Sequence, residues 1–254
     1  MVDSNFIASA CSLTYFASGL ILLNYGDASQ LSYKTLQLMY VQLLFEIPFL
    51  FLEEGFSFFH VIFYGCNISV ITRILIRFRT PDDILHDTYR PELDNFPFHG
   101  LLPVLAIVCA FIVHHRSKGD GVNICYESAL RFEDAQMRMT CGIQFLWMAS
   151  YCLMPLMFMP QLRMCFNLKD DLQNSCKTFL VCMMVYVAMV AVLDISFNPR
   201  WHVSIVCSTV AIFVLGLPFF RRHKRVACCS RNQQAAGVVP SGGYVLMETE
   251  LEFC

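Results

Sequence analysis

The chain has 254 residues, of which 56% are hydrophobic and only 15% are charged. Soluble domains are typically about 45–50% apolar and about 25% charged, and a core of this size cannot hide the excess. The composition therefore excludes a soluble globular enzyme as the default class, and it excludes a disordered chain more firmly. The net charge of −2 gives no basis for nucleic-acid binding.

Seven stretches of the chain are apolar enough to cross a bilayer, which takes roughly 20 mostly apolar residues per helix. We expect helices, because backbone groups in lipid must be satisfied within the segment. The first stretch lacks a charged start, which favours a retained span over a cleaved signal peptide. The predicted spans are 5–24, 33–52, 56–76, 97–114, 140–159, 176–195 and 201–220. The predicted fold class is therefore all-α integral membrane.

Lys and Arg predict the orientation of these spans, because basic loops stay on the cytosolic side. If the N-terminus is lumenal, Lys and Arg are more numerous in the cytosolic segments than in the lumenal ones. The loop 116–138, which is then lumenal, also carries several of them. We expect a seven-helix membrane domain at 1–220 with a lumenal N-terminus. The remaining residues, 221–254, are predicted to form a cytosolic, disordered tail.

Ionisable residues within a span are candidates for function, because hydrocarbon penalises them by roughly 2.5–3.5 kcal/mol on insertion scales. Glu46 has apolar neighbours on both sides, so we interpret it as a buried functional group. Asp194 fits an interior site and the membrane interface equally well. Arg73 is best explained by a side chain that reaches the cytosolic headgroups. His60 is a fourth such residue, near the lumenal end of its span.

Motifs for metal binding or catalysis are missing from the sequence. The cysteines form no CxxC pair, and most fall in apolar runs where a thiol acts as a small apolar side chain. The histidines lack the spacing of zinc ligands, and no nucleophile elbow or phosphate loop occurs. We therefore predict no catalytic residue, no metal and no cofactor.

The octapeptide 86–93 reads HDTYRPEL, and several shorter motifs accompany it. It is close to His-Asp-Thr-Phe-Arg-x-Glu-Phe of a known family, and the chain resembles that family, the KDEL receptors, which retain lumenal proteins of the endoplasmic reticulum. The shorter matches are Cys66, Arg77-Phe78-Arg79, Leu31-Ser32-Tyr33-Lys34-Thr35, Ala110-Phe111-Ile112-Val113-His114-His115, Trp147 and Pro160-Gln161-Leu162. Pro155 and Pro160 are also predicted to interrupt the fifth span.

The resemblance implies a fold and a function. The fold is two three-helix bundles joined by a linker helix, as in sugar transporters of the SWEET or PQ-loop type. The function is retrieval of lumenal proteins between the Golgi and the endoplasmic reticulum through C-terminal Lys-Asp-Glu-Leu-type signals. Arginines would hold the acidic peptide and its carboxylate, and a histidine would make binding favourable in acid.

The resemblance fails at several positions of the family's ligand site. Glu46 aligns with an arginine, which reverses the charge, and Val187 replaces the arginine that follows Tyr186. The candidate ligand-binding residues are therefore Trp147, Gln144, Tyr186, Glu46 and Asp194. Such a site predicts weak or absent binding of an acidic KDEL-type peptide.

The tail begins with a basic group that the resemblance would assign to sorting, namely Arg221, Arg222, Lys224 and Arg225. These residues could recruit a vesicle coat or anchor the helix end on anionic lipid. Palmitoylation of Cys228 and Cys229 is an open alternative to two unmodified thiols.

The leading hypothesis is a divergent sorting receptor of the endoplasmic reticulum and Golgi membrane. Its partners would be C-terminal signal peptides, the sorting machinery and the lipid bilayer. The alternatives are a small-solute transporter of the SWEET or PQ-loop type on the same scaffold and a ligand-free adaptor.

Overall fold

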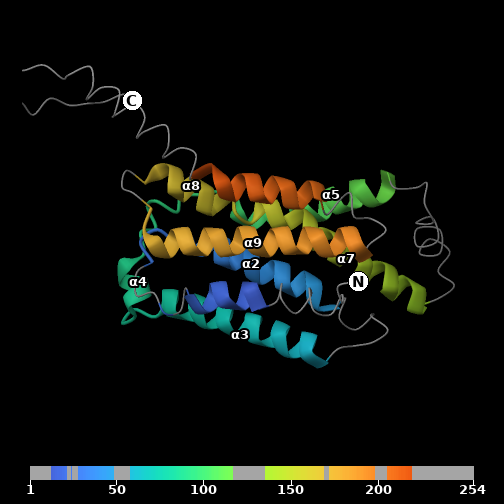
Figure 1. The fold of residues 1–254 in the computed structure, drawn as a ribbon, viewed down its shortest axis with the longest axis horizontal. Helices are drawn as coiled ribbons and strands as arrows, with labels where there is room; N and C mark the ends of the chain where they lie inside the picture. The colour runs from blue at the N-terminus through green and yellow to red at the C-terminus, as the bar shows by residue number, and fades with distance from the viewer. Residues whose placement is uncertain are drawn as a thin grey trace, which may run out of the picture.

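The computed structural model describes residues 13–21, 24, 28–48, 58–116, 135–168, 172–197 and 205–218. Within these ranges every regular element is a helix (Figure 1). The elements are a helix at 13–21, α2 (Tyr33–Glu46), α3 (Phe58–Arg79), α4 (Ile84–Thr88), η2 (His99–Leu101), α5 (Leu102–Arg116), α7 (Ala135–Leu156), α8 (Met159–Asn167), α9 (Asn174–Phe197) and a helix at 205–218.

The limits of these helices follow from local chemistry. Ser32 caps α2, because its hydroxyl accepts the Thr35 backbone N–H at 3.1 Å. Pro155 lies in the last turn of α7, and Pro160 lies in the first turn of α8 after a turn at 157–158. The predicted interruption of the fifth span is thus confirmed, since proline removes a backbone donor and bends a helix.

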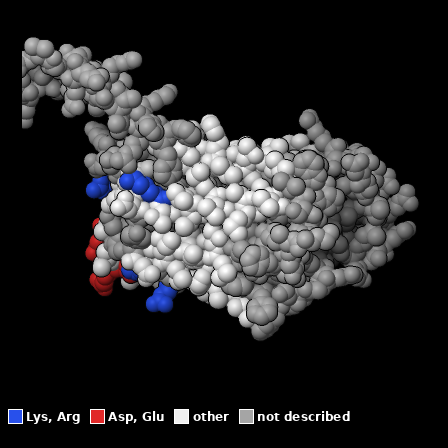
Figure 2. All heavy atoms as spheres, viewed as in Figure 1, with Lys and Arg blue, Asp and Glu red and all other residues white. Residues whose placement is uncertain are grey.

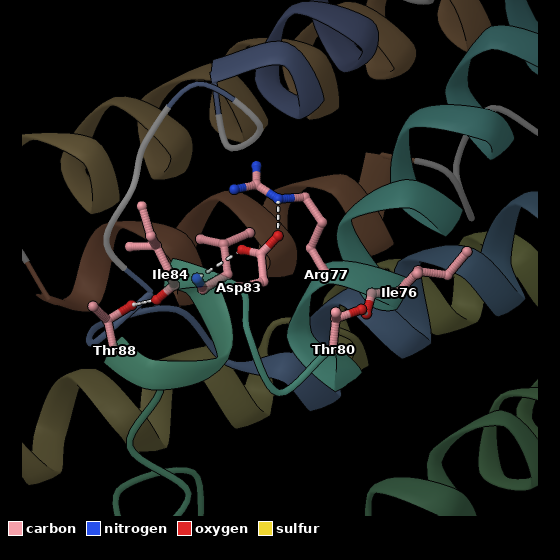
Figure 3. Close-up of polar contacts among 7 residues, drawn as sticks. Ile76, Arg77, Thr80, Asp83, Ile84 and Thr88 are labelled. Carbon is pink, nitrogen blue, oxygen red and sulfur yellow. Dashed lines mark hydrogen bonds and ion pairs between the residues drawn. The ribbon is translucent and has the colours of Figure 1, made fainter.

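The turn between α3 and α4 is closed by hydrogen bonds and an ion pair (Figure 3). Arg77 donates to Asp83 at 2.7 Å, and the other Asp83 oxygen accepts the backbone N–H of Leu85 at 2.9 Å. The Arg77 hydrogen bond, the Leu85 N–H and the Arg77 charge together lower the pKa of Asp83.

We expect Asp83→Asn to weaken this turn near neutral pH. Because the pKa of Asp83 is lower in the folded chain, its ionised form adds stability above the unfolded pKa of about 3.9. That contribution is lost as the pH falls through the folded value. The free energies of unfolding of wild type and variant should therefore differ at pH 7 and converge in acid. Asp82→Asn, at the exposed neighbour, is the control; an equal loss there would contradict the role of Asp83.

Helix packing brings α2 to the centre of the described chain. α2 contacts α3, α5, α7 and α8, and α5 packs along α7. The helix at 13–21 lies against α9, where the Tyr15 and Tyr186 rings meet edge to face at 4.9 Å. It also lies close to α3, because a Cβ added to Gly19 would stand 2.6 Å from Val70 Cγ1. Gly19 therefore sets the approach of these two helices.

The surface agrees in part with a membrane protein. Among the described residues, one helical stretch, Phe145–Asn167, is long and apolar enough to cross a membrane. Shorter apolar helices run over His99–Val113, Cys176–Val192 and Ile205–Pro218. The exposed side chains of α5 include Val104, Leu105, Val108, Phe111 and Ile112.

The charged side chains that Figure 2 colours gather at one end of the molecule, the end where Figure 1 places α4. The surface along the helices carries uncoloured side chains in the same view. In this view the charged end is separate from an uncharged surface along the helices, as expected for a protein that spans lipid.

Candidate functional site

Glu46 is the last residue of α2, and Ile47 and Pro48 follow it in a tighter helical turn. Its carboxylate accepts hydrogen bonds from Gln42 Nε2 at 3.1 Å and from the Tyr64 hydroxyl at 2.9 Å. Gln42 lies one turn earlier on α2, so helical spacing sets the first contact. Tyr64, from α3, supplies the second. Two donors thus hold a partly buried carboxylate between α2 and α3.

Tyr15 connects α2 with a second predicted site residue, Tyr186. Its ring packs on Tyr186 of α9, and its hydroxyl donates to the Met39 carbonyl of α2 at 3.5 Å. Tyr186 is 7% exposed. The structure therefore places Tyr186 against Tyr15, a residue that sequence analysis did not select, and Tyr15 against the middle of α2.

The structure says less about the other predicted site residues. Trp147 lies on α7, where its ring meets Tyr151 edge to face at 4.8 Å. Gln144 and Asp194 lie on α7 and α9, but their side chains are outside the described part of the structure. The basic residues Arg221, Arg222, Lys224 and Arg225, the cysteines Cys228 and Cys229 and the whole predicted tail also lie outside the described residues.

A small cavity lies between the helix at 13–21, α2 and α3. Its volume of about 10 Å³ is close to the room that one water molecule needs. Tyr15, Ser18 and Asn67 bring polar atoms to a lining that is otherwise apolar. Asn67 is 4% exposed, and its Oδ1 atom accepts no hydrogen bond from the described residues. A buried acceptor of this kind calls for a hydrogen-bond donor.

A second polar group, which we name the α4-end cluster, joins distant segments of the chain. It consists of Gln30, Ser32, Asp94, Gln161 and Gln173. Asp94 is 2% exposed and accepts from Ser32 Oγ at 2.8 Å, from the Tyr89 hydroxyl at 2.7 Å and from the Lys34 backbone N–H at 3.3 Å. Burial, then the hydrogen bond to Asp94 and its charge, raise the pKa of Tyr89.

Gln161 is the centre of this cluster. Its side-chain oxygen accepts the Ser32 backbone N–H at 2.8 Å, and its Nε2 donates to the Gln30 carbonyl at 2.8 Å. Its own backbone N–H donates to the Thr35 hydroxyl at 3.0 Å. Gln173 extends the cluster, because its backbone N–H donates to Gln30 Oε1 at 2.6 Å. The start of α2 is thereby joined to α8 and to the start of α9.

Sequence analysis singled out Pro160-Gln161 and the octapeptide 86–93 but assigned no contact to either. The structure gives both a role in the α4-end cluster, through Gln161 and Tyr89. The cluster joins α2 to α8 and to the start of α9 by hydrogen bonds, whereas the Glu46 region offers a carboxylate that accepts from two donors. Within the described residues no group of three His, Cys, Asp or Glu side chains could hold a metal ion.

The comparisons with known proteins give one positive result. A comparison with curated proteins yields no match. The family model of the ER lumen protein retaining receptor matches residues 27–196, which includes α2 to α8 and nearly all of α9. This match covers more than half of the chain and includes both Glu46 and the α4-end cluster. The chain belongs to the ER lumen protein retaining receptor family.

Proposed function

We propose that this chain is a retrieval receptor that recognises a C-terminal signal of lumenal proteins with a ligand site of changed charge. Family membership makes it a membrane receptor for retention of lumenal proteins of the endoplasmic reticulum, in the endoplasmic reticulum and Golgi membrane, and not a member of an enzyme family. The changed ligand site is the part that we add. Glu46, held by Gln42 and Tyr64, is the observation that carries it.

Glu46 bears on the ligand through its charge. Two donors hold the carboxylate in one position, so a bound ligand meets its negative charge at a fixed point. An acidic tetrapeptide with a free carboxylate is repelled there, whereas a neutral or basic signal is not. Tyr186 on α9 and Trp147 on α7 supply aromatic surface for apolar parts of a ligand. Gln144 and Asp194 complete the proposed site.

The proposed receptor has seven membrane spans arranged as two three-helix bundles and a linker helix, which is α5. Its N-terminus is lumenal and its C-terminal tail is cytosolic. The sequence supports this orientation, because Lys and Arg are more numerous in the segments that it places on the cytosolic side. In this arrangement Glu46 lies toward the lumen, where the ligand arrives. Arg221, Arg222, Lys224 and Arg225 then face the vesicle coat or the lipid headgroups.

A retention assay tests the proposed function. A secreted reporter with a library of four-residue C-termini is expressed with or without this chain, and the secreted fraction is measured. We expect retention to rise for a subset of C-termini that is poor in Asp and Glu. Blocking the C-terminus of those reporters with one added residue should abolish retention. Uniform secretion of the whole library would contradict the proposal.

The cavity beside Asn67 favours a second candidate, a small-solute transporter, because its unpaired acceptor is suited to a hydroxylated solute. Its volume of about 10 Å³ is too small for a sugar in this conformation. Solute uptake by reconstituted vesicles distinguishes the two functions. A transporter takes up solute without any peptide, whereas the receptor shows no uptake.

A further inference from the structure

Two cysteines lie side by side at the α4-end cluster. Cys165 belongs to α8, and Cys176 lies in the first turn of α9. Both sulfur atoms flank one nitrogen, because Gln161 Nε2 lies 3.4 Å from Cys165 Sγ and 3.6 Å from Cys176 Sγ. Two sulfur atoms that share one donor are neighbours, and a covalent link between them requires that the Gln161 amide moves aside.

The two cysteines differ in access to solvent. Cys176 is fully buried, whereas Cys165 is partly exposed. A dissolved oxidant therefore reaches Cys165 first, and Cys176 is positioned to react with the product. This pairing of an accessible thiol with a protected neighbour is the arrangement that redox-sensing sites use.

We propose that Cys165 and Cys176 form a redox modification site that peroxide converts into a disulfide. In the first step the Cys165 thiolate attacks a peroxide oxygen, the O–O bond breaks, and hydroxide leaves, which gives sulfenic acid at Cys165. In the second step the Cys176 sulfur attacks the Cys165 sulfur, the S–O bond breaks, and water leaves. The sum is two thiols and one hydrogen peroxide converted to one disulfide and two waters.

The disulfide would act on the joint between the two halves of the chain. Gln161 lies between the thiols and also holds the Ser32 N–H and the Gln30 carbonyl. A link from α8 to α9 would restrict separation of the α4-end segments and change the contacts that Gln161 Nε2 makes with the two sulfur atoms. With that end in a reducing cytosol, the dithiol is the resting form and oxidation is transient.

Tryptic digestion tests the site directly, because the chain cleaves after Arg163, Lys169 and Lys177. The cysteines then lie on separate peptides, 164–169 (MCFNLK) and 170–177 (DDLQNSCK). The full-length protein in membranes is treated with hydrogen peroxide, blocked with N-ethylmaleimide and digested. We expect a species in which the two peptides are joined by a disulfide, with a mass two hydrogens below their sum. A reductant should separate it into the two peptides. Absence of the joined species after oxidation would overturn the proposal.

Two variants serve as controls. Cys176→Ser should abolish the joined species and leave Cys165 as a sulfenic acid that reacts with dimedone. Cys182→Ser, farther along α9, should leave the joined species unchanged. Phenylarsine oxide, which bridges neighbouring thiols, should protect both peptides from N-ethylmaleimide in the wild type. In Cys176→Ser it should leave Cys165 open to N-ethylmaleimide. Equal alkylation with and without phenylarsine oxide in the wild type would contradict the proximity of the thiols.

Discussion

Gln161→Leu should lower the free energy of unfolding by about 2–4 kcal/mol. The substitution removes the acceptor for the Ser32 N–H and the donor to the Gln30 carbonyl, and both contacts are buried. Each buried polar group left without a partner costs about 1–3 kcal/mol. Leucine is close to glutamine in volume, so packing changes little. Thermal unfolding of the purified protein in detergent measures the loss.

Gln37→Leu is the matched control, because Gln37 lies on α2 and is only partly buried. It should change the free energy of unfolding by less than about 0.5 kcal/mol, as is usual for substitutions away from a buried network. Gln161→Glu keeps an acceptor for the Ser32 N–H. Only a protonated carboxyl group can also donate to the Gln30 carbonyl, so the free energy of unfolding of this variant should lie between those of the wild type and Gln161→Leu only when the carboxyl group is protonated. Equal stability of Gln161→Leu and Gln37→Leu would show that the α4-end cluster is not a structural joint.

Glu46→Gln should strengthen binding of a Lys-Asp-Glu-Leu peptide by about tenfold or more. Neutralising Glu46 removes repulsion of the peptide's carboxylates, and tenfold corresponds to about 1.4 kcal/mol. Glutamine keeps an oxygen that accepts from the Tyr64 hydroxyl. Its NH2 group can donate to Gln42 Oε1, which has no partner among the described residues of the wild type, once the Gln42 amide turns over. Peptide titrations of both proteins at equal ionic strength measure the difference, which should shrink as salt is added.

Glu92→Gln provides the control for net charge, because Glu92 is exposed in the segment after α4. It should leave peptide affinity unchanged. A gain in affinity from both substitutions would mean that overall charge, and not the Glu46 region, governs binding. No gain from Glu46→Gln would place Glu46 outside the ligand site.

Much of the fold was predictable because it depends on local chemistry. Apolar stretches of sufficient length predict helices, and Pro155 and Pro160 predict the break between α7 and α8. The octapeptide and the motifs around it predict the family, which the match over residues 27–196 confirms. The seven spans and their orientation remain predictions, since one described stretch meets the length and apolarity of a span.

The candidate site was less predictable because it depends on contacts between distant residues. The Gln42 contact with Glu46 follows from helical spacing and could have been found in the sequence. The Tyr64 contact needs the register of α3 against α2, which no local pattern gives. Gln161 and Gln30 are 131 residues apart, so a Pro-Gln pair cannot reveal its partner. Cys165 looked like a small apolar residue for the same reason, and no motif singled out Cys176.

Peptide binding to the wild-type protein tests the central claim most directly. The purified chain in detergent is titrated with a labelled peptide that ends in Lys-Asp-Glu-Leu, at about pH 5.5 and about pH 7.4, with a C-terminally amidated peptide as the control. A ligand site built around Glu46 predicts weak or absent binding at both pH values and little difference between the two peptides. Carboxylate-dependent binding with a low-micromolar or tighter dissociation constant in acid would contradict the changed ligand site.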